Sequence, residues 1–152
     1  MPKGKLLLLD LEANAHPVYK YTDAFYGHDF IWSLIHNFGQ KPGVFGNLTS
    51  MAVGPVEARA DAPSNFKGIG LAMEGINQNF VIYELATEMI WHGDHEGEWP
   101  LGDLKTWAQN YRISRYGSKS ANGPSREAWD LLTDASRGGV CRWFALLCFD
   151  DR

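Results

Sequence analysis

Three short apolar runs, each followed at once by polar residues, constrain the fold of this 152-residue chain most strongly. They span residues 5–11, 30–35 and 67–73, and the last is followed by Glu74. Strands of a parallel sheet are covered on both faces, so their sequences are continuously apolar rather than alternating. The pattern therefore predicts three buried parallel strands, with polar groups gathered where the strands end.

Helices are predicted between and after these runs, at residues 48–60, 79–91 and 103–116, with another beginning near Pro124. Gly54 and Pro55 are expected to interrupt the first, because proline lacks a backbone N–H and clashes with the preceding turn. This order predicts an α/β fold: the last strands and helices of a (β/α)8 barrel over residues 1–92, then the beginning of an all-helical domain over residues 93–152. Three strands cannot close an eight-stranded barrel, so an incomplete barrel is expected.

Composition argues against several classes of partner and cofactor. A net charge of -4 and a pI near 5.7 disfavour a nucleic-acid partner, which requires a basic face. No apolar run reaches the roughly 18 residues of a membrane helix, and the first run is too short for the core of a signal peptide. No glycine-rich phosphate loop is present, and the histidines at 92–96 match no zinc spacing. Neither a cofactor nor a metal site is predicted.

The polar residues at the strand ends are the predicted site, because α/β barrels carry catalytic groups there. Glu74 follows an apolar strand, where a carboxylate needs a partner or a catalytic task; capping the next helix is the alternative. Trp32 suits stacking on a sugar ring, although core packing is the favoured explanation of the residue taken alone. His36 and Asn37 suit hydrogen bonds to sugar hydroxyls or an N-acetyl group. Their alternatives are a buried histidine and a turn asparagine.

Two strings are specific: Trp-x-x-x-His-Asn-Phe-Gly at 32–39 and Glu-Gly-Ile-x-Gln-Asn at 74–79. With further matches over residues 1–132, they resemble the alpha-N-acetylglucosaminidase family of glycoside hydrolases. The resemblance implies a (β/α)8 catalytic domain, an all-helical domain, and removal of terminal alpha-linked N-acetylglucosamine, in animals from heparan sulfate. It also implies retaining chemistry, with Glu74 as nucleophile and the acid/base carboxylate on an earlier strand that this chain lacks.

The chain is therefore predicted to be a fragment of such an enzyme, inactive alone, whose partner is a glycan ending in N-acetylglucosamine. A non-catalytic sugar-binding module and a structural remnant are the alternatives. No nucleic acid or membrane is an expected partner, and oligomerisation is left open for the full-length protein. The family implies a lysosomal or secreted location, with no signal peptide in this chain. Ser33 and residues 40–42 depart from the family pattern, and residues from 138 onward look foreign to it.

Overall fold

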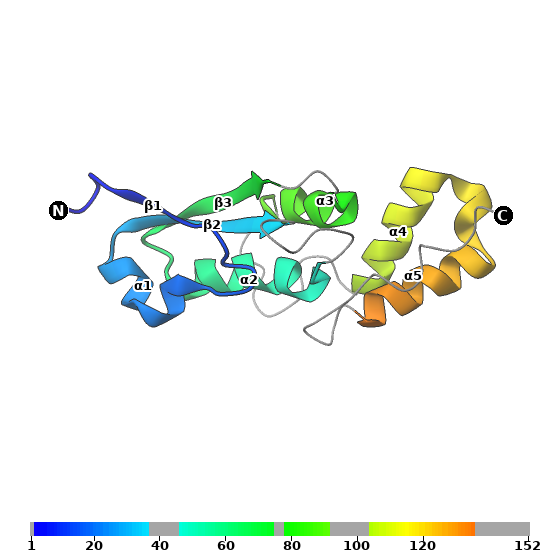
Figure 1. Ribbon diagram of the computed structural model, residues 1–152, viewed down its shortest axis with the longest axis horizontal. Helices are drawn as coiled ribbons and strands as arrows, with labels where there is room; N and C mark the ends of the chain where they lie inside the picture. Colours follow the sequence, from blue (N-terminus) through cyan, green and yellow to red (C-terminus); the bar gives the residue numbers. More distant parts are fainter. Residues whose placement is uncertain (1, 37–45, 75–77, 92–103, 136–152) are drawn as a thin grey trace.

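A three-stranded parallel sheet organises the N-terminal half of the molecule (Figure 1). The computed structural model describes residues 2–36, 46–74, 78–91 and 104–135. Strand β1 (Leu7–Asp10) pairs with β2 (Asp29–His36), and β2 pairs with β3 (Phe66–Met73), which gives the order β1-β2-β3. The predicted α/β class and the three parallel strands are confirmed.

The connection from β1 to β2 contains an unusual backbone turn. It consists of the 3-10 helix η1 (Val18–Tyr21) and one left-handed turn, α1 (Asp23–Tyr26), whose residues have φ between 48 and 55°. Left-handed backbone is costly for residues other than glycine. Asn65 stabilises the turn, because its Nδ2 donates to the carbonyl oxygen of Ala24 at 2.7 Å.

Helix α2 (Leu48–Asp61) connects β2 to β3 and runs without a break. The predicted interruption at Gly54 and Pro55 is wrong. A residue before proline normally avoids helical backbone because its Cβ meets the proline ring, and Gly54 has no Cβ. Pro55 is buried in the core, and its packing there helps to offset the backbone hydrogen bond that proline cannot make.

Three further helices follow β3: α3 (Phe80–Met89), α4 (Leu104–Tyr116) and α5 (Pro124–Ala135), with the 3-10 turn η2 (Ser118–Ala121) before the last. Their positions agree with the predicted helices to within one or two residues. Helices α4 and α5 pack through aromatic rings. The ring centroid of Tyr111 lies 5.7 Å from that of Trp107 on the same helix and 5.4 Å from that of Trp129 on α5. In the described part of the chain, no helix is long and apolar enough to cross a membrane.

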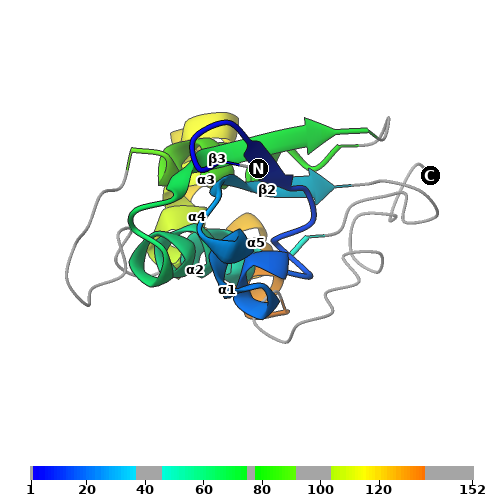
Figure 2. The same ribbon diagram turned by 90° about the vertical axis from the view of Figure 1, so that its left-hand side faces the viewer.

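The two faces of the sheet differ in burial. Figure 2 shows α1 and α2 on one side of the sheet, and on that side Phe30 and Trp32 are 0% and 1% exposed. The opposite side, here called the open face, carries Leu7 and Leu9, which are 53% and 57% exposed. The first apolar run was predicted to be covered on both faces. That expectation is wrong for β1, because it lies at the sheet edge and only one side receives a packed layer.

Candidate active site

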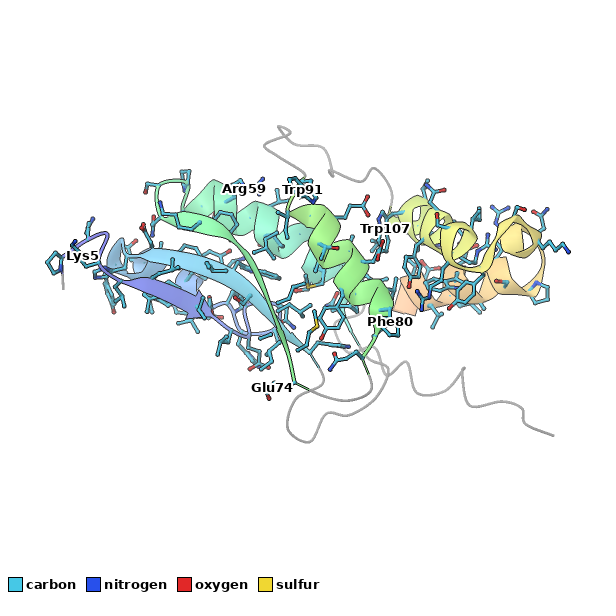
Figure 3. All side chains as sticks on the ribbon, turned by 90° about the horizontal axis from the view of Figure 1, so that it is seen from above. Lys5, Arg59, Glu74, Phe80, Trp91 and Trp107 are labelled. Carbon is cyan, nitrogen blue, oxygen red and sulfur yellow. The ribbon has the colours of Figure 1, made fainter. Side chains whose placement is uncertain are left out.

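Glu74 lies at the carboxyl edge of the sheet, where β2 and β3 end together. His36, the last residue of β2, is paired in register with Met73, the last residue of β3. Figure 3 shows Glu74 at that edge, directly after β3. Its side chain is exposed, so the apolar surroundings predicted for it are not found. The reason is that the chain leaves the sheet at Met73, and the glutamate stands beyond the packed strands.

Small residues precede Glu74 on the open face. In register, Gly68, Gly70 and Ala72 of β3 pair with Ile31, Ser33 and Ile35 of β2. The fit is close, since a Cβ added to Gly70 would stand 2.6 Å from Oγ of Ser33. Glu74 follows the last residue of this strand directly. On this face β3 therefore contributes small residues, while Ser33 and Ile35 of β2 beside them are buried.

Trp32 does not lie at this edge. It is in the middle of β2, faces α2, and is 1% exposed, with its ring against Gly54. A tryptophan in that position packs the core, the explanation that the residue alone favoured. Its predicted stacking on a sugar stays a prediction, and the buried position does not support it.

His36 is at the predicted edge, but its side chain is 2% exposed and faces the helices. Its ring meets the ring of Tyr83 edge-on, with centroids 5.7 Å apart and an interplanar angle of 78°. Burial lowers the pKa of His36 from 6.5 to about 4, so the imidazole is neutral near pH 7. A neutral, buried ring is better suited to holding neighbouring residues in place than to contacting a substrate that enters from solvent. Asn37 lies outside the described residues.

Tyr83 and Gln78 form a hydrogen bond that the sequence motifs did not predict. The Tyr83 hydroxyl, on α3, donates to Oε1 of Gln78, in the connection that follows Glu74. Burial raises the pKa of Tyr83, which keeps its hydroxyl protonated and able to donate. The sequence feature that could have indicated this bond is Tyr83 itself. It is an aromatic residue with a hydroxyl group, and it lies five residues after Gln78 of the Glu-Gly-Ile-x-Gln-Asn string.

Other carboxylates in the described part of the chain are placed differently. Asp10 ends β1 and is buried, and a carboxylate oxygen accepts from the backbone N–H of Tyr19 at 3.1 Å. Burial raises the pKa of Asp10, partly opposed by the backbone hydrogen bonds from Tyr19 and Val18. This is a structural role in holding η1. Among the described residues no group of three or more His, Cys, Asp or Glu side chains is arranged to hold a metal, and residues 92–96 lie outside them.

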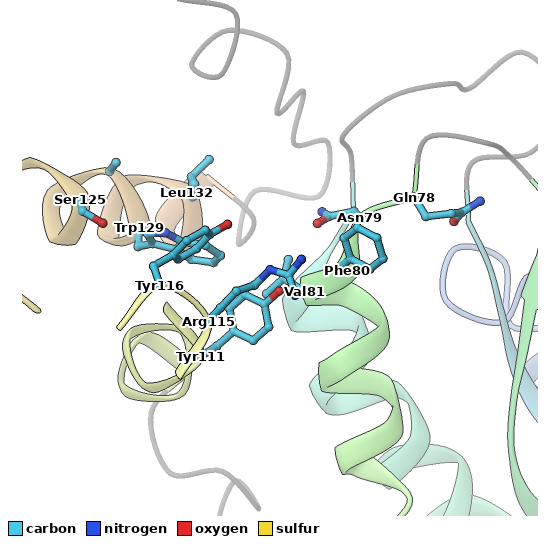
Figure 4. Close-up of a pocket in the computed structure, with 11 residues that line it drawn as sticks. Gln78, Asn79, Phe80, Val81, Tyr111, Arg115, Tyr116, Ser125, Trp129 and Leu132 are labelled. Carbon is cyan, nitrogen blue, oxygen red and sulfur yellow. The ribbon is translucent and has the colours of Figure 1, made fainter. Parts of the chain in front are cut away.

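A cavity of about 480 Å³ lies between the start of α3 and helices α4 and α5 (Figure 4). Gln78 and Asn79 line one side, and Tyr116 and Trp129 line the other. Arg115 stands over the ring of Phe80, with its guanidinium carbon 5.0 Å from the ring centroid. Gln78 and Asn79, which follow Glu74 closely in the sequence, therefore line a cavity that also has aromatic walls.

The chain is similar to known proteins over most of its length. Residues 1–93 match the family model described as the alpha-N-acetylglucosaminidase (NAGLU) tim-barrel domain. The solved structure of a family 89 glycoside hydrolase from Clostridium perfringens in complex with PUGNAc superposes with a TM-score of 0.73 at 28% identity, covering 88% of this chain and 14% of that chain. The chain thus matches part of a TIM-barrel domain found in a family of glycoside hydrolases.

The family follows from the first match and from a human relative. Human alpha-N-acetylglucosaminidase is 42% identical over 145 residues, which are 93% of this chain and 19% of the human protein. This chain belongs to the alpha-N-acetylglucosaminidase family, as its motifs predicted. It spans only 19% of the length of the human relative.

Proposed function

We propose that this chain carries the nucleophile of a retaining alpha-N-acetylglucosaminidase, and that the nucleophile is Glu74. The observation that carries the proposal is the position of Glu74, exposed directly after β3 in a segment that matches the family's barrel domain. Barrel enzymes bind and act at the carboxyl ends of their strands. An exposed carboxylate at that edge has room to reach the anomeric carbon of a sugar.

Retaining hydrolysis needs a second carboxylate, about 5–5.5 Å from the first, as acid and then base. Asp10 does not suit this role, because it is buried beneath η1 on the other side of the sheet and bound to a backbone N–H. We therefore assign the acid/base to a part of the whole enzyme outside this chain. On this proposal the chain alone does not hydrolyse glycosides.

The substrate in this proposal is a glycan with a terminal alpha-linked N-acetylglucosamine, of the heparan sulfate type. Asn37 and His36 belong to the sugar-binding edge, Asn37 by direct hydrogen bonds and His36 by holding the edge in place. Residues 1–92 form barrel and residues 93–152 begin the helical domain. The whole enzyme acts in the lysosome or after secretion, with assembly into oligomers left to the complete protein.

The test places this segment in a complete enzyme. Residues 1–132 replace the segment of human alpha-N-acetylglucosaminidase to which they are similar, and hydrolysis of a disaccharide with terminal alpha-linked N-acetylglucosamine is measured. Glu74→Gln should abolish nearly all activity. Glu84→Gln, which changes an exposed glutamate on α3, is the matched control and should leave activity unchanged. Equal activity of the Glu74 variant and its parent would refute the assignment.

Azide distinguishes the two possible roles of Glu74. With Glu74→Ala and an activated aryl substrate, azide should restore turnover and give the beta-glycosyl azide, because one displacement replaces two. An alpha-glycosyl azide would instead make Glu74 the acid/base.

The chain on its own should not turn over the disaccharide. Turnover that Glu74→Gln abolishes would show that the chain needs no second carboxylate from elsewhere.

A further inference from the structure

The connection from Glu74 to α3 is held at Gln78. Helix α3 begins at Phe80 after its N-cap, Asn79, so only a few residues separate the proposed nucleophile from the helix. Gln78 lies within this connection and accepts the hydrogen bond from the Tyr83 hydroxyl. Tyr83 is 8% exposed and is carried by the first turns of α3. Gln78 is therefore held by a buried side chain.

Tyr83 also packs against the end of β2, beside the strand that leads into Glu74. Its ring packs edge-on against His36, with centroids 5.7 Å apart, and His36 is paired with Met73, the residue before Glu74. One side chain thus touches the strand end next to Glu74 and the connection after it. Gly46 closes the same cluster, since a Cβ there would stand 2.5 Å from Cδ1 of Ile82 and 3.5 Å from the His36 ring.

Tyr83 and His36 each keep one protonation state over a wide range of pH. Burial raises the pKa of Tyr83 and lowers the pKa of His36 to about 4. The hydroxyl remains a donor and the imidazole remains neutral at every pH between these limits. The contact between them is therefore constant, which suits a group whose task is to hold geometry.

We infer that Tyr83 is a positioning residue for Glu74, acting through the hydrogen bond to Gln78 and the packing against His36. The inference rests on the proposed function, in which Glu74 reacts with the anomeric carbon. A displacement of about 1 Å at a reacting group lowers the rate by up to about 100-fold, so an anchor on each side of the nucleophile has a direct catalytic consequence.

The kinetic test uses the same human enzyme carrying residues 1–132 of this chain. Tyr83→Phe keeps the ring against His36 and removes only the hydroxyl. We expect kcat to fall by about tenfold or more with KM changed less than about threefold, because positioning acts in the transition state. Gln78→Ala should give a similar loss, and the double variant should lose no more than either single variant. Tyr21→Phe, at a tyrosine 83% exposed, is the control and should behave as the parent.

The outcomes separate this inference from the proposed function. An unchanged kcat in Tyr83→Phe, while Glu74→Gln is inactive, overturns the positioning role alone. Additive losses in the double variant do so as well, because they would show that the two groups act independently. Activity that survives Glu74→Gln overturns the proposed function instead.

A second measurement needs no catalysis and uses the isolated chain with Leu7 and Leu9 replaced by lysine as the parent, because these exposed leucines on the edge strand favour association. Backbone ¹⁵N relaxation of Glu74 and Gln78 is compared between the parent chain and Tyr83→Phe. Loss of the anchor should increase the mobility of both amides, while amides in the middle of α2 are unchanged. Equal mobility of Glu74 and Gln78 in the two proteins would show that the hydroxyl anchors nothing, and would overturn the inference whatever the activity of the human enzyme carrying this segment.

Discussion

Gly54 of α2 lies directly against the indole ring of Trp32 of β2. A Cβ added to Gly54 would stand 2.6 Å from Cζ2 and 3.1 Å from Cε2 of that ring. Trp32 is 1% exposed and cannot swing into solvent without leaving the core. The absence of a side chain at residue 54 thus sets the distance between the helix and the sheet.

Gly54→Ala should therefore destabilise the protein. Alanine gains about 1 kcal/mol over glycine in a helix interior, but overpacking a core typically costs about 1–3 kcal/mol. We expect a net loss of stability, measured by urea unfolding followed by tryptophan fluorescence. Ala60→Gly, at an exposed position of the same helix, reports the propensity effect alone. A Gly54→Ala protein more stable than its parent would show that Trp32 moves aside at little cost.

Stability should fall as the pH is lowered through the range in which His36 would protonate. The pKa of His36 is lowered in the folded state from 6.5 to about 4, so the unfolded chain binds the proton more tightly. The loss begins near pH 6.5, is complete near pH 4, and amounts to about 3 kcal/mol, since one pKa unit is about 1.4 kcal/mol. The free energy of unfolding of His36→Gln should depend less steeply on pH over this range. His16→Gln, which removes an exposed imidazole, is the matched control.

Asn47 caps α2, because its Oδ1 accepts from the backbone N–H of Ser50 at 2.9 Å. Asn47→Ala should lower the free energy of unfolding by about 0.5–2 kcal/mol. Asn47→Asp keeps an accepting oxygen at the same place and should cost much less. Equal losses in the two variants, measured by urea unfolding, would mean that the cap contributes nothing.

Helices α3 and α4 are joined by a hydrogen bond from Nε1 of Trp107 to Oε2 of Glu88, at 2.6 Å. A double-mutant cycle with Trp107→Phe and Glu88→Ala should give a coupling energy of about 1–2 kcal/mol, as expected of a hydrogen bond to a charged group. The control cycle uses Lys105 and Asp134, an exposed ion pair at 2.8 Å, and should give less than about 1 kcal/mol. A larger coupling in the control cycle would contradict this ranking.

The isolated chain should self-associate through the open face. Leu7 and Leu9 expose apolar side chains on an edge strand, and such edges pair with other chains. Replacing both by lysine should shift the sedimentation coefficient toward that of a monomer, and this variant is a suitable background for the unfolding experiments. Leu131→Lys changes an equally exposed leucine on α5 and should leave association as it is. A parent chain that sediments as a single monomer would refute the prediction.

The amino-acid sequence by itself determined the elements, the family and the position of the glutamate. Continuous apolar runs predicted the strands to within about two residues, and the spacing of apolar residues did the same for α3 and α4. These signals are local, because strand and helix periodicity act over a few neighbouring residues. Glu74 was found in the same way, from its place directly after a strand.

Only the tertiary structure decided which face each side chain meets. An apolar strand is compatible with a helix layer on either side, so the burial of Trp32 and the exposure of Leu9 could not be predicted from their own segments. The contact of Tyr83 with His36 joins residues on different elements, and it exists because α3 packs back across the end of β2. Chain crossover and layer packing set such contacts, and these are properties of the whole fold rather than of any one run of residues.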